Sequence, residues 1–121
     1  MSEVTEEEKR HKSVQVLGGL IREFLAGRYS VILLQFNDFL GLSEDEYINL
    51  LGPMDSSGGG DDVDVFTYIT DVTRDPKSEK CLLTIKTLEV RLDVQENGIY
   101  AIHEVRGHTG IKETDCKDKG E

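Results

Sequence analysis

The dipeptide Asn97-Gly98 constrains the fold of this chain more than any other feature of its sequence. Asparagine followed by glycine is the preferred pair for a two-residue type I′ turn between antiparallel strands, and such a turn fixes the register of the whole hairpin. One face of the hairpin then carries the pairs Val94 with Ala101, Leu92 with His103 and Val90 with Val105. The other face carries the oppositely charged pairs Arg91 with Glu104 and Glu89 with Arg106. Because both faces are coherent, the sequence predicts a β-hairpin here.

Other segments also have the pattern of strands. Residues 30–36 form a β-branched and apolar run without polar alternation, which predicts a central strand covered on both faces. Residues 63–72 place Phe66 and Tyr68 on one face of a strand. In residues 80–95 the apolar positions change from odd to even numbers, so we expect a bulge or bend near Lys86-Thr87 that restores a single inner face.

The N-terminal segment has the periodicity of a helix. Thr5 and Glu8 have capping-box spacing, and Gly27 is placed to end the helix in a left-handed cap. Between them, apolar residues recur every three or four positions and predict a buried stripe: Val14, Leu17, Leu20, Ile21, Phe24 and Leu25. The pair Gly18-Gly19 inside this helix indicates close backbone packing or a bend.

A shorter helix and two loose segments follow from the remaining signals. Ser43 and Glu46 repeat the capping-box spacing, and Gly52-Pro53 ends a short acidic helix. Residues 54–62 contain three consecutive glycines, so we expect a mobile loop. Residues 107–121 offer few apolar side chains and are expected to be a flexible polar tail.

These elements predict an α+β fold: an antiparallel sheet of about four strands, with the long N-terminal helix packed on one face and the short acidic helix at an edge. A chain of 121 residues fits one domain, which we place at residues 1–106. The longest aliphatic run, Val31 to Leu34, is far shorter than the ~20 apolar residues of a membrane-spanning helix. The acidic N-terminus does not resemble a secretory signal, so a cytoplasmic location is expected, with Cys81 and Cys116 as free thiols.

The residues that most often carry chemistry do not form a recognisable set. His103 is expected to be a hydrogen-bonded core histidine. A zinc site made of His103, His108 and Cys116 lacks a further Cys or His at ligand spacing. The segment that begins at Asp55 has the glycine of an EF-hand at its sixth place but Phe66 at its twelfth. We therefore expect no metal, no cofactor and no enzymatic activity.

Acidic residues are concentrated in one part of the chain. The formal net charge is −10, from 24 acids against 14 Lys and Arg. No Lys or Arg lies between Arg28 and Arg74, and nine acids, Asp71 among them, fall there. This charge opposes unaided binding to nucleic acids or anionic membranes and favours a basic protein partner. The expected partner-binding residues are Asp38, Glu44, Asp45, Glu46, Asp55, Asp61, Asp62 and Asp64.

Together these observations favour a non-enzymatic, acidic protein-binding module. One form of it is an inhibitor or antagonist, phage-type or immunity-type, of a basic nucleic-acid-binding protein or nuclease, with carboxylates in the place of phosphates. One alternative is a homo-oligomeric adaptor or chaperone-like protein, for example a homodimer, that pairs apolar edges between subunits. Another is a small-ligand or cation-binding protein that uses the 54–64 loop. The plainest alternative is an acidic surface that keeps the protein in solution and binds nothing specific.

Overall fold

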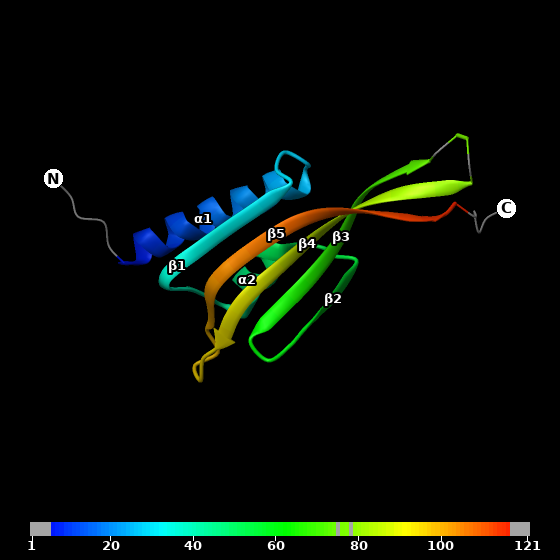
Figure 1. Cartoon of the computed structure of the whole chain (residues 1–121). Helices are drawn as coiled ribbons and strands as arrows, with labels where there is room; N and C mark the ends of the chain where they lie inside the picture. The colour runs from blue at the N-terminus through cyan, green and yellow to red at the C-terminus, as the bar shows by residue number, and fades with distance from the viewer. Residues whose placement is uncertain (1–5, 75, 78, 117–121) are drawn as a thin grey trace.

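The computed structural model describes residues 6–74, 76–77 and 79–116, which form a five-stranded antiparallel sheet and two helices. Their order along the chain is α1 (Glu6–Leu25), β1 (Val31–Leu42), α2 (Glu44–Leu51), β2 (Ser56–Gly59), β3 (Val63–Arg74), β4 (Lys80–Val94) and β5 (Tyr100–Asp115). Within the sheet the order is β1-β5-β4-β3-β2, so β1 and β2 are the edges. Figure 1 shows α1 lying along β1, while β3, β4 and β5 extend beyond the helices. The predicted α+β class is confirmed, with five strands where about four were expected.

Helix α1 buries the stripe that its sequence predicts. Leu17, Ile21 and Phe24 are fully buried, and the other three members of the stripe pack against the core. Gly27 follows the helix with a φ of 92°, as expected for a left-handed cap. At Gly18 an added Cβ would lie 3.5 Å from the Leu50 side chain of α2, so this glycine allows the two helices to approach closely. The capping residue expected at position 5 lies outside the described residues.

Both helices cover the same face of the sheet. Gly107 and Phe66 both pair with Leu88, so all three residues face the same way. Phe24 of α1 reaches Gly107, and Tyr47 of α2 contacts Phe66. No helix among the described residues is long and apolar enough to cross a membrane.

Strand β1 is an edge strand, and the prediction of a central strand covered on both faces was wrong. Ile32 is buried against the helices, whereas Val31 and Leu33 on the opposite face are 67% and 53% exposed. The apolar run therefore supplies side chains to both faces, but helices cover one face alone. An uninterrupted apolar run does not by itself distinguish these two environments.

The predicted hairpin joins β4 to β5, but its turn differs from the expected one. Among the described residues no residue other than glycine has a positive φ, which excludes a type I′ turn at Asn97-Gly98. The loop has three residues instead of two: Gly98, with a φ of 87°, donates its N–H to the carbonyl of Gln95. This geometry is typical of a type I turn followed by a G1 bulge.

A second irregularity, a β-bulge at His103, restores the predicted register further along the hairpin. Near the turn Leu92 pairs with Ile102, not with His103, and Val94 pairs with Tyr100, not with Ala101. Beyond the bulge, the expected pairs Val90 with Val105, Arg91 with Glu104 and Glu89 with Arg106 are all confirmed. The longer turn and the bulge each shift the register by one residue, and the two shifts cancel.

The register of β3 with β4 shifts between Ile69 and Asp71, opposite Ile85 and Thr84, but β4 itself has no bulge at the predicted Lys86-Thr87. Its pairing with β5 is continuous through this point, and Lys86 is buried on the helix-covered face. The Lys86 ammonium donates to the carbonyl of Tyr29 (3.1 Å) and to the hydroxyl of Thr109 (2.8 Å), and it lies 4.8 Å from the centre of the Phe24 ring. Lys86 occupies the last position of β4 that the helices cover. The apolar residues change from odd to even numbers at this point because the strand leaves the helices there.

Two segments that were expected to be irregular are strands. Residues Ser56–Gly59, inside the expected mobile loop, pair with β3 as β2. Strand β5 continues to Asp115, which pairs with Lys80, so the expected flexible tail is paired backbone over residues 107–115. Residues 117–121 of the expected tail lie outside the described residues. Because strand pairing uses backbone groups, a segment with few apolar side chains can still join a sheet.

The two cysteines form a disulfide, so the prediction of free thiols was wrong. Cys81 lies near the start of β4, and Cys116 directly follows β5, with 5.2 Å between their Cα atoms. Pairing of β5 along the whole of β4 brings these residues together.

Candidate functional site

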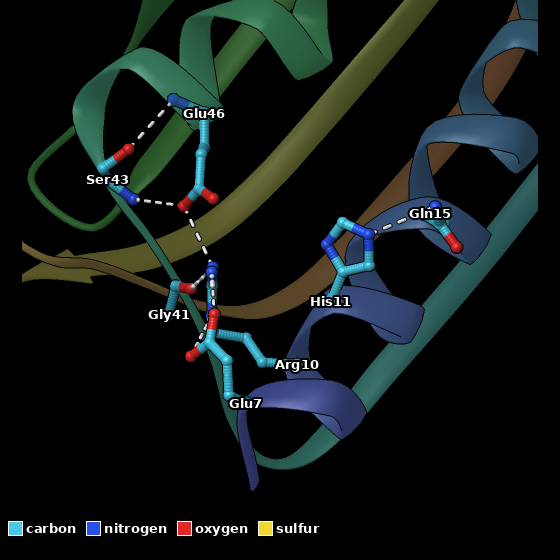
Figure 2. Close-up of polar contacts among 7 residues, drawn as sticks. All are labelled: Glu7, Arg10, His11, Gln15, Gly41, Ser43 and Glu46. Carbon is cyan, nitrogen blue, oxygen red and sulfur yellow. Dashed lines mark hydrogen bonds and ion pairs between the residues drawn. The ribbon is translucent and has the colours of Figure 1, made fainter. Parts of the chain in front are cut away.

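The N-terminus of α2 is held by the capping box that its sequence predicts (Figure 2). The Ser43 hydroxyl accepts the N–H of Glu46 (3.1 Å), and the Glu46 carboxylate accepts the N–H of Ser43 (2.9 Å). Arg10 of α1 donates to the same carboxylate (3.0 Å), to the carbonyl of Gly41 (3.2 Å) and to Glu7 (2.8 Å). Arg10 therefore fastens the start of α1 to the junction between β1 and α2.

These contacts remove Glu46 from the acidic surface. The Ser43 N–H and the Arg10 guanidinium hold the pKa of Glu46 below its ordinary value. The same guanidinium lowers the pKa of Glu7 and has its own pKa raised by both carboxylates. A carboxylate that pairs with an arginine and caps a helix adds little to the negative electrostatic potential that a binding partner would experience. Glu46 is therefore a structural residue.

Tyr47 fixes α2 over the sheet. Its ring is buried, stacks on Tyr100 at 4.9 Å between ring centres, and meets Phe66 edge-on at 6.2 Å. Its hydroxyl donates to the carboxylate of Asp64 at 2.8 Å. Burial, together with the nearby Asp64, raises the pKa of Tyr47, so the hydroxyl keeps its proton and remains a donor. On the same face, the buried Tyr68 hydroxyl donates to the carbonyl of Leu51, and burial raises its pKa to about 12.

A cleft of about 320 Å³ lies between α2 and the β2–β3 hairpin, and we call it the α2–β2 cleft. Its lining is mainly apolar and aromatic, with Glu44, Ser57 and Asp64 as its polar residues. The full lining is Glu44, Tyr47, Ile48, Leu51, Met54, Ser57, Gly58, Asp64, Phe66 and Tyr100. An apolar wall with two carboxylates suits a lysine or arginine side chain, whose stem is apolar and whose head is cationic.

The structure brings some of the predicted acidic residues to this cleft. Glu44 and Asp64 line it, and Asp45 follows Glu44 in the exposed first turn of α2. Asp61 and Asp62 lie in the exposed turn that joins β2 to β3, three and two residues before Asp64. These five residues form what we call the acidic end of the molecule.

Other predicted residues lie away from the acidic end. Asp38 lies in the irregular part of β1, at the opposite edge of the sheet from β2. Asp55 precedes β2 and accepts the N–H of Ile69 at 2.6 Å. Asp71 lies on the part of β3 that extends beyond Ile69 and accepts the hydroxyl of Thr73. These acids therefore lie on more than one part of the surface, because sheet pairing places segments that are contiguous in sequence at both edges of the sheet.

His103 is not a core residue, contrary to the expectation. It is the bulged residue of β5, and its side chain is 42% exposed. One ring nitrogen lies 3.1 Å from the carbonyl of Asp38, and the other lies 3.0 Å from the carboxylate of Asp93. Both partners are acceptors, so both contacts are hydrogen bonds when both ring nitrogens carry protons. The contacts link β1, β4 and β5 beside the bulge.

The cation site considered for residues 54–64 finds no support in the geometry. Asp55 is engaged with the backbone of β3, and Asp64 accepts the hydroxyl of Tyr47. Among the described residues, no group of three or more His, Cys, Asp or Glu side chains is arranged to hold a metal ion. Asp55 and Asp64 therefore already have hydrogen-bond partners in β3 and α2.

Three important side chains were missed from the sequence. Arg10 looks like an ordinary exposed helix residue, and its partner Glu46 lies 36 residues away. Lys86 interrupts an apolar strand, which suggested a bulge and not a buried amine. Tyr47 was counted as one apolar position of α2, with no sign that its hydroxyl would reach Asp64. In each case the partner is distant in sequence, so no local pattern reports it.

The fold has counterparts among proteins of archaeal viruses. The thermo- and acido-stable ORF-99 of the archaeal virus AFV1 matches with a TM-score of 0.63 and 22% identity, over 85% of this chain and 97% of that one. ORF14 of the Sulfolobus islandicus filamentous virus SIFV matches with a TM-score of 0.54 and 22% identity, over 91% and 89% of the two chains. No known protein family and no curated protein matches the sequence. At this level of identity the likeness shows a shared fold alone.

Proposed function

We propose that this protein is a non-enzymatic binding module whose acidic end contacts a basic surface of another protein. The observation that supports this most is the α2–β2 cleft, which combines an apolar wall with the carboxylates of Glu44 and Asp64. Asp45, Asp61 and Asp62 add negative charge beside it, and residues 29–73 contain no lysine or arginine. An inhibitor or antagonist of a nuclease or another nucleic-acid-binding protein is one form that such a module can take.

Electrostatics determine how such a partner would bind. Complementary charge raises association rates and sets specificity, and its effect weakens as salt screens the charges. The acidic end is exposed, so its contribution is expected in the association rate and in the salt dependence. The cleft is expected to supply the anchor, since a buried cationic side chain leaves slowly once it is paired.

The proposal is tested by capturing the partner from a cell extract at low and high salt, identifying it, and measuring its binding with purified components. Replacing Glu44 with Gln and Asp61 and Asp62 with Asn should weaken binding by roughly tenfold and reduce its dependence on salt. The folding of the variant is checked by its melting temperature.

The matched control removes the same charge elsewhere, with Asp38→Asn, Asp71→Asn and Glu113→Gln. Since both triple variants lose three negative charges, a general effect of net charge would weaken both equally. If both variants bind equally well, or if the affinity of the natural protein does not change with salt, the acidic end is not the binding surface.

A second candidate function is self-association through the strand arm, which we define as residues 69–74, 80–85 and 110–115. This arm extends beyond the helices (Figure 1) and exposes large apolar side chains: Ile69, Val72, Leu82 and Ile111 are 43%, 57%, 40% and 64% exposed. The register places Ile69 and Val72 on one face of the arm and Leu82 and Ile111 on the other, so each face offers exposed apolar side chains for an interface. Sedimentation velocity tests this, because a monomer at every concentration would exclude it and Ile111→Glu should dissociate a dimer.

The proposal includes a cytoplasmic location, which fractionation of cells that contain a tagged protein would test. Disulfides are rare in reducing compartments, so a cytoplasmic location requires the Cys81–Cys116 bond to resist reduction there. Recovery of the protein in its disulfide-bonded form from a reducing cytoplasm would show that the bond resists reduction there.

A further inference from the structure

Strand β2 is an open edge of the sheet. Within the part of the chain that the structure describes, it pairs with β3 alone, and all four of its residues are exposed. Gly60 donates its N–H to the carbonyl of Val63 (2.8 Å), so these two residues form a hydrogen-bonded pair. Hydrogen-bonded and non-hydrogen-bonded pairs alternate along an antiparallel ladder, so Ser57 directs its N–H and C=O away from β3. These groups can pair with a strand from another chain.

The other edge of the sheet is better protected than β2. The register of β1 is interrupted between Gln35 and Leu40, and α1 lies along this strand (Figure 1). By contrast, the sequence of β2 is Ser-Ser-Gly-Gly, and its register with β3 is continuous. Bulges, lysines and prolines are the usual protection of an edge strand, and β2 contains none of them.

The α2–β2 cleft opens beside this edge. Ser57 lines the cleft and pairs with Phe66, which contacts Tyr47, so the Ser57 side chain lies on the helix-covered face. A strand added about 4.8 Å beyond β2 would direct every second side chain to the same face. The side chain opposite Ser57 would therefore enter the cleft, which Glu44 and Asp64 also line.

We infer that β2 is the docking edge for an extended basic segment of a partner protein, which joins the sheet as a sixth strand and inserts a lysine or arginine side chain into the α2–β2 cleft. This inference rests on the proposed function, because it describes how the basic partner binds. Backbone pairing along β2 supplies affinity without sequence preference. The carboxylates of Glu44 and Asp64 supply the preference for a cation, and the aromatic wall packs against the aliphatic stem.

A second copy of this chain suits the edge less well. The segment from Asp55 to Asp62 contains three acids and no basic residue. Antiparallel pairing of two β2 strands would bring Asp55 of one copy near Asp61 of the other. Like charges at neighbouring cross-strand positions are destabilising. The charge around this edge therefore selects a cationic strand.

The test uses three fluorescent peptides of eight residues in which arginine and threonine alternate. The first peptide has an ordinary backbone, the second is N-methylated at each arginine, and the third is N-methylated at each threonine. A residue opposite Ser57 shares its face and belongs to a hydrogen-bonded pair, so an arginine that enters the cleft directs its N–H toward β2. Methylation at arginine should therefore weaken binding at least tenfold, whereas methylation at threonine should change it less than about threefold.

Variants of the protein provide the reciprocal measurement. Ser57→Pro removes the outward N–H at an edge position that accommodates proline, and it should weaken the unmethylated peptide at least tenfold. Asp38→Asn, on the opposite edge of the sheet from β2, is the control and should bind within about twofold of the natural protein. If Ser57→Pro does not fold, the two methylated peptides still decide the question, because they leave the protein unchanged.

The outcomes separate this inference from the proposed function. Equal binding of the two methylated peptides would show attraction by charge without strand pairing, which overturns the inference and leaves the proposed function intact. If none of the peptides binds while a purified basic partner binds through the acidic end, the inference again fails alone. If neither the peptides nor any basic partner binds in a salt-dependent way, both fail.

Discussion

Gly107 provides the sharpest test of the fold, because it was expected to begin a flexible tail and instead lies in the core. An alanine Cβ at this position would lie 2.8 Å from Cγ1 of Ile32 and 2.9 Å from Cζ of Phe24. These distances are shorter than ordinary van der Waals contacts between carbon atoms. Phe24 is fully buried and Ile32 is 5% exposed, so neither side chain can move into solvent to make room.

The expected cost of Gly107→Ala follows from this geometry. Overpacking a well-packed core costs about 1–3 kcal/mol. The lower conformational freedom of alanine in the unfolded chain offsets roughly 0.4–1 kcal/mol of this. We therefore expect the free energy of unfolding to fall by about 1–2 kcal/mol, and the melting temperature by roughly 4–8 °C for a chain of this size.

Urea denaturation followed by circular dichroism measures this change, and Gly110→Ala on the same strand is the control. No atom lies within 4 Å of a Cβ added at Gly110, so that variant should stay within about 0.5 kcal/mol of the natural protein. Adding Phe24→Leu to Gly107→Ala removes the ring atoms that clash. The double variant should therefore show a coupling energy of about 1 kcal/mol. Equal stability of the two alanine variants would refute the placement of Gly107 beneath α1.

Three further predictions concern other parts of the structure. Replacing Cys81 and Cys116 with serine should lower the free energy of unfolding by about 3–4 kcal/mol, because the disulfide closes a loop with a sequence separation of 35. A thiol assay of the unfolded natural protein should find no free thiol unless the protein is first reduced. The pKa of Glu46 is lowered in the folded state, so its charge stabilises the fold above the ordinary carboxyl pKa of 4.5, and this contribution is lost as the pH falls through the lower folded value. Glu46→Gln should thus flatten the pH dependence of urea stability below about pH 5, and an unchanged profile would contradict the assignment. Tyr47→Phe removes the donor to Asp64 and should cost about 1 kcal/mol in the same denaturation assay, with no change in secondary structure by circular dichroism.

The parts of the fold that were predicted correctly depend on signals from neighbouring residues. The stripe of α1 follows from a spacing of three and four residues, and the capping box of α2 joins Ser43 to Glu46 within one turn. Three cross-strand pairs of the hairpin were also correct, because alternation on both strands fixes the register beyond the bulge. The bulge and the three-residue turn were missed, since each shifts the register by one residue and the sequence pattern far from the turn is the same with or without them.

The candidate site was predicted in part for the same reason. The absence of lysine and arginine from residues 29–73 is visible in the sequence and indicates the acidic end. Whether a given carboxylate contributes to it depends on contacts made by distant residues. Arg10 neutralises Glu46 from 36 positions away, and Asp55 is engaged by the backbone of Ile69.

The sequence by itself determined the helices, the register of the central hairpin beyond its bulge and the acidic character of residues 29–73, because these depend on side-chain periodicity and on formal charge. Tertiary structure decided the rest. Residues 56–59 and 107–115 became strands because β3 and β4 offered backbone groups for them to pair with, and this pairing does not require apolar side chains. The same pairing joined Cys81 to Cys116, placed Gly107 beneath α1, and left β2 as an open edge beside the α2–β2 cleft.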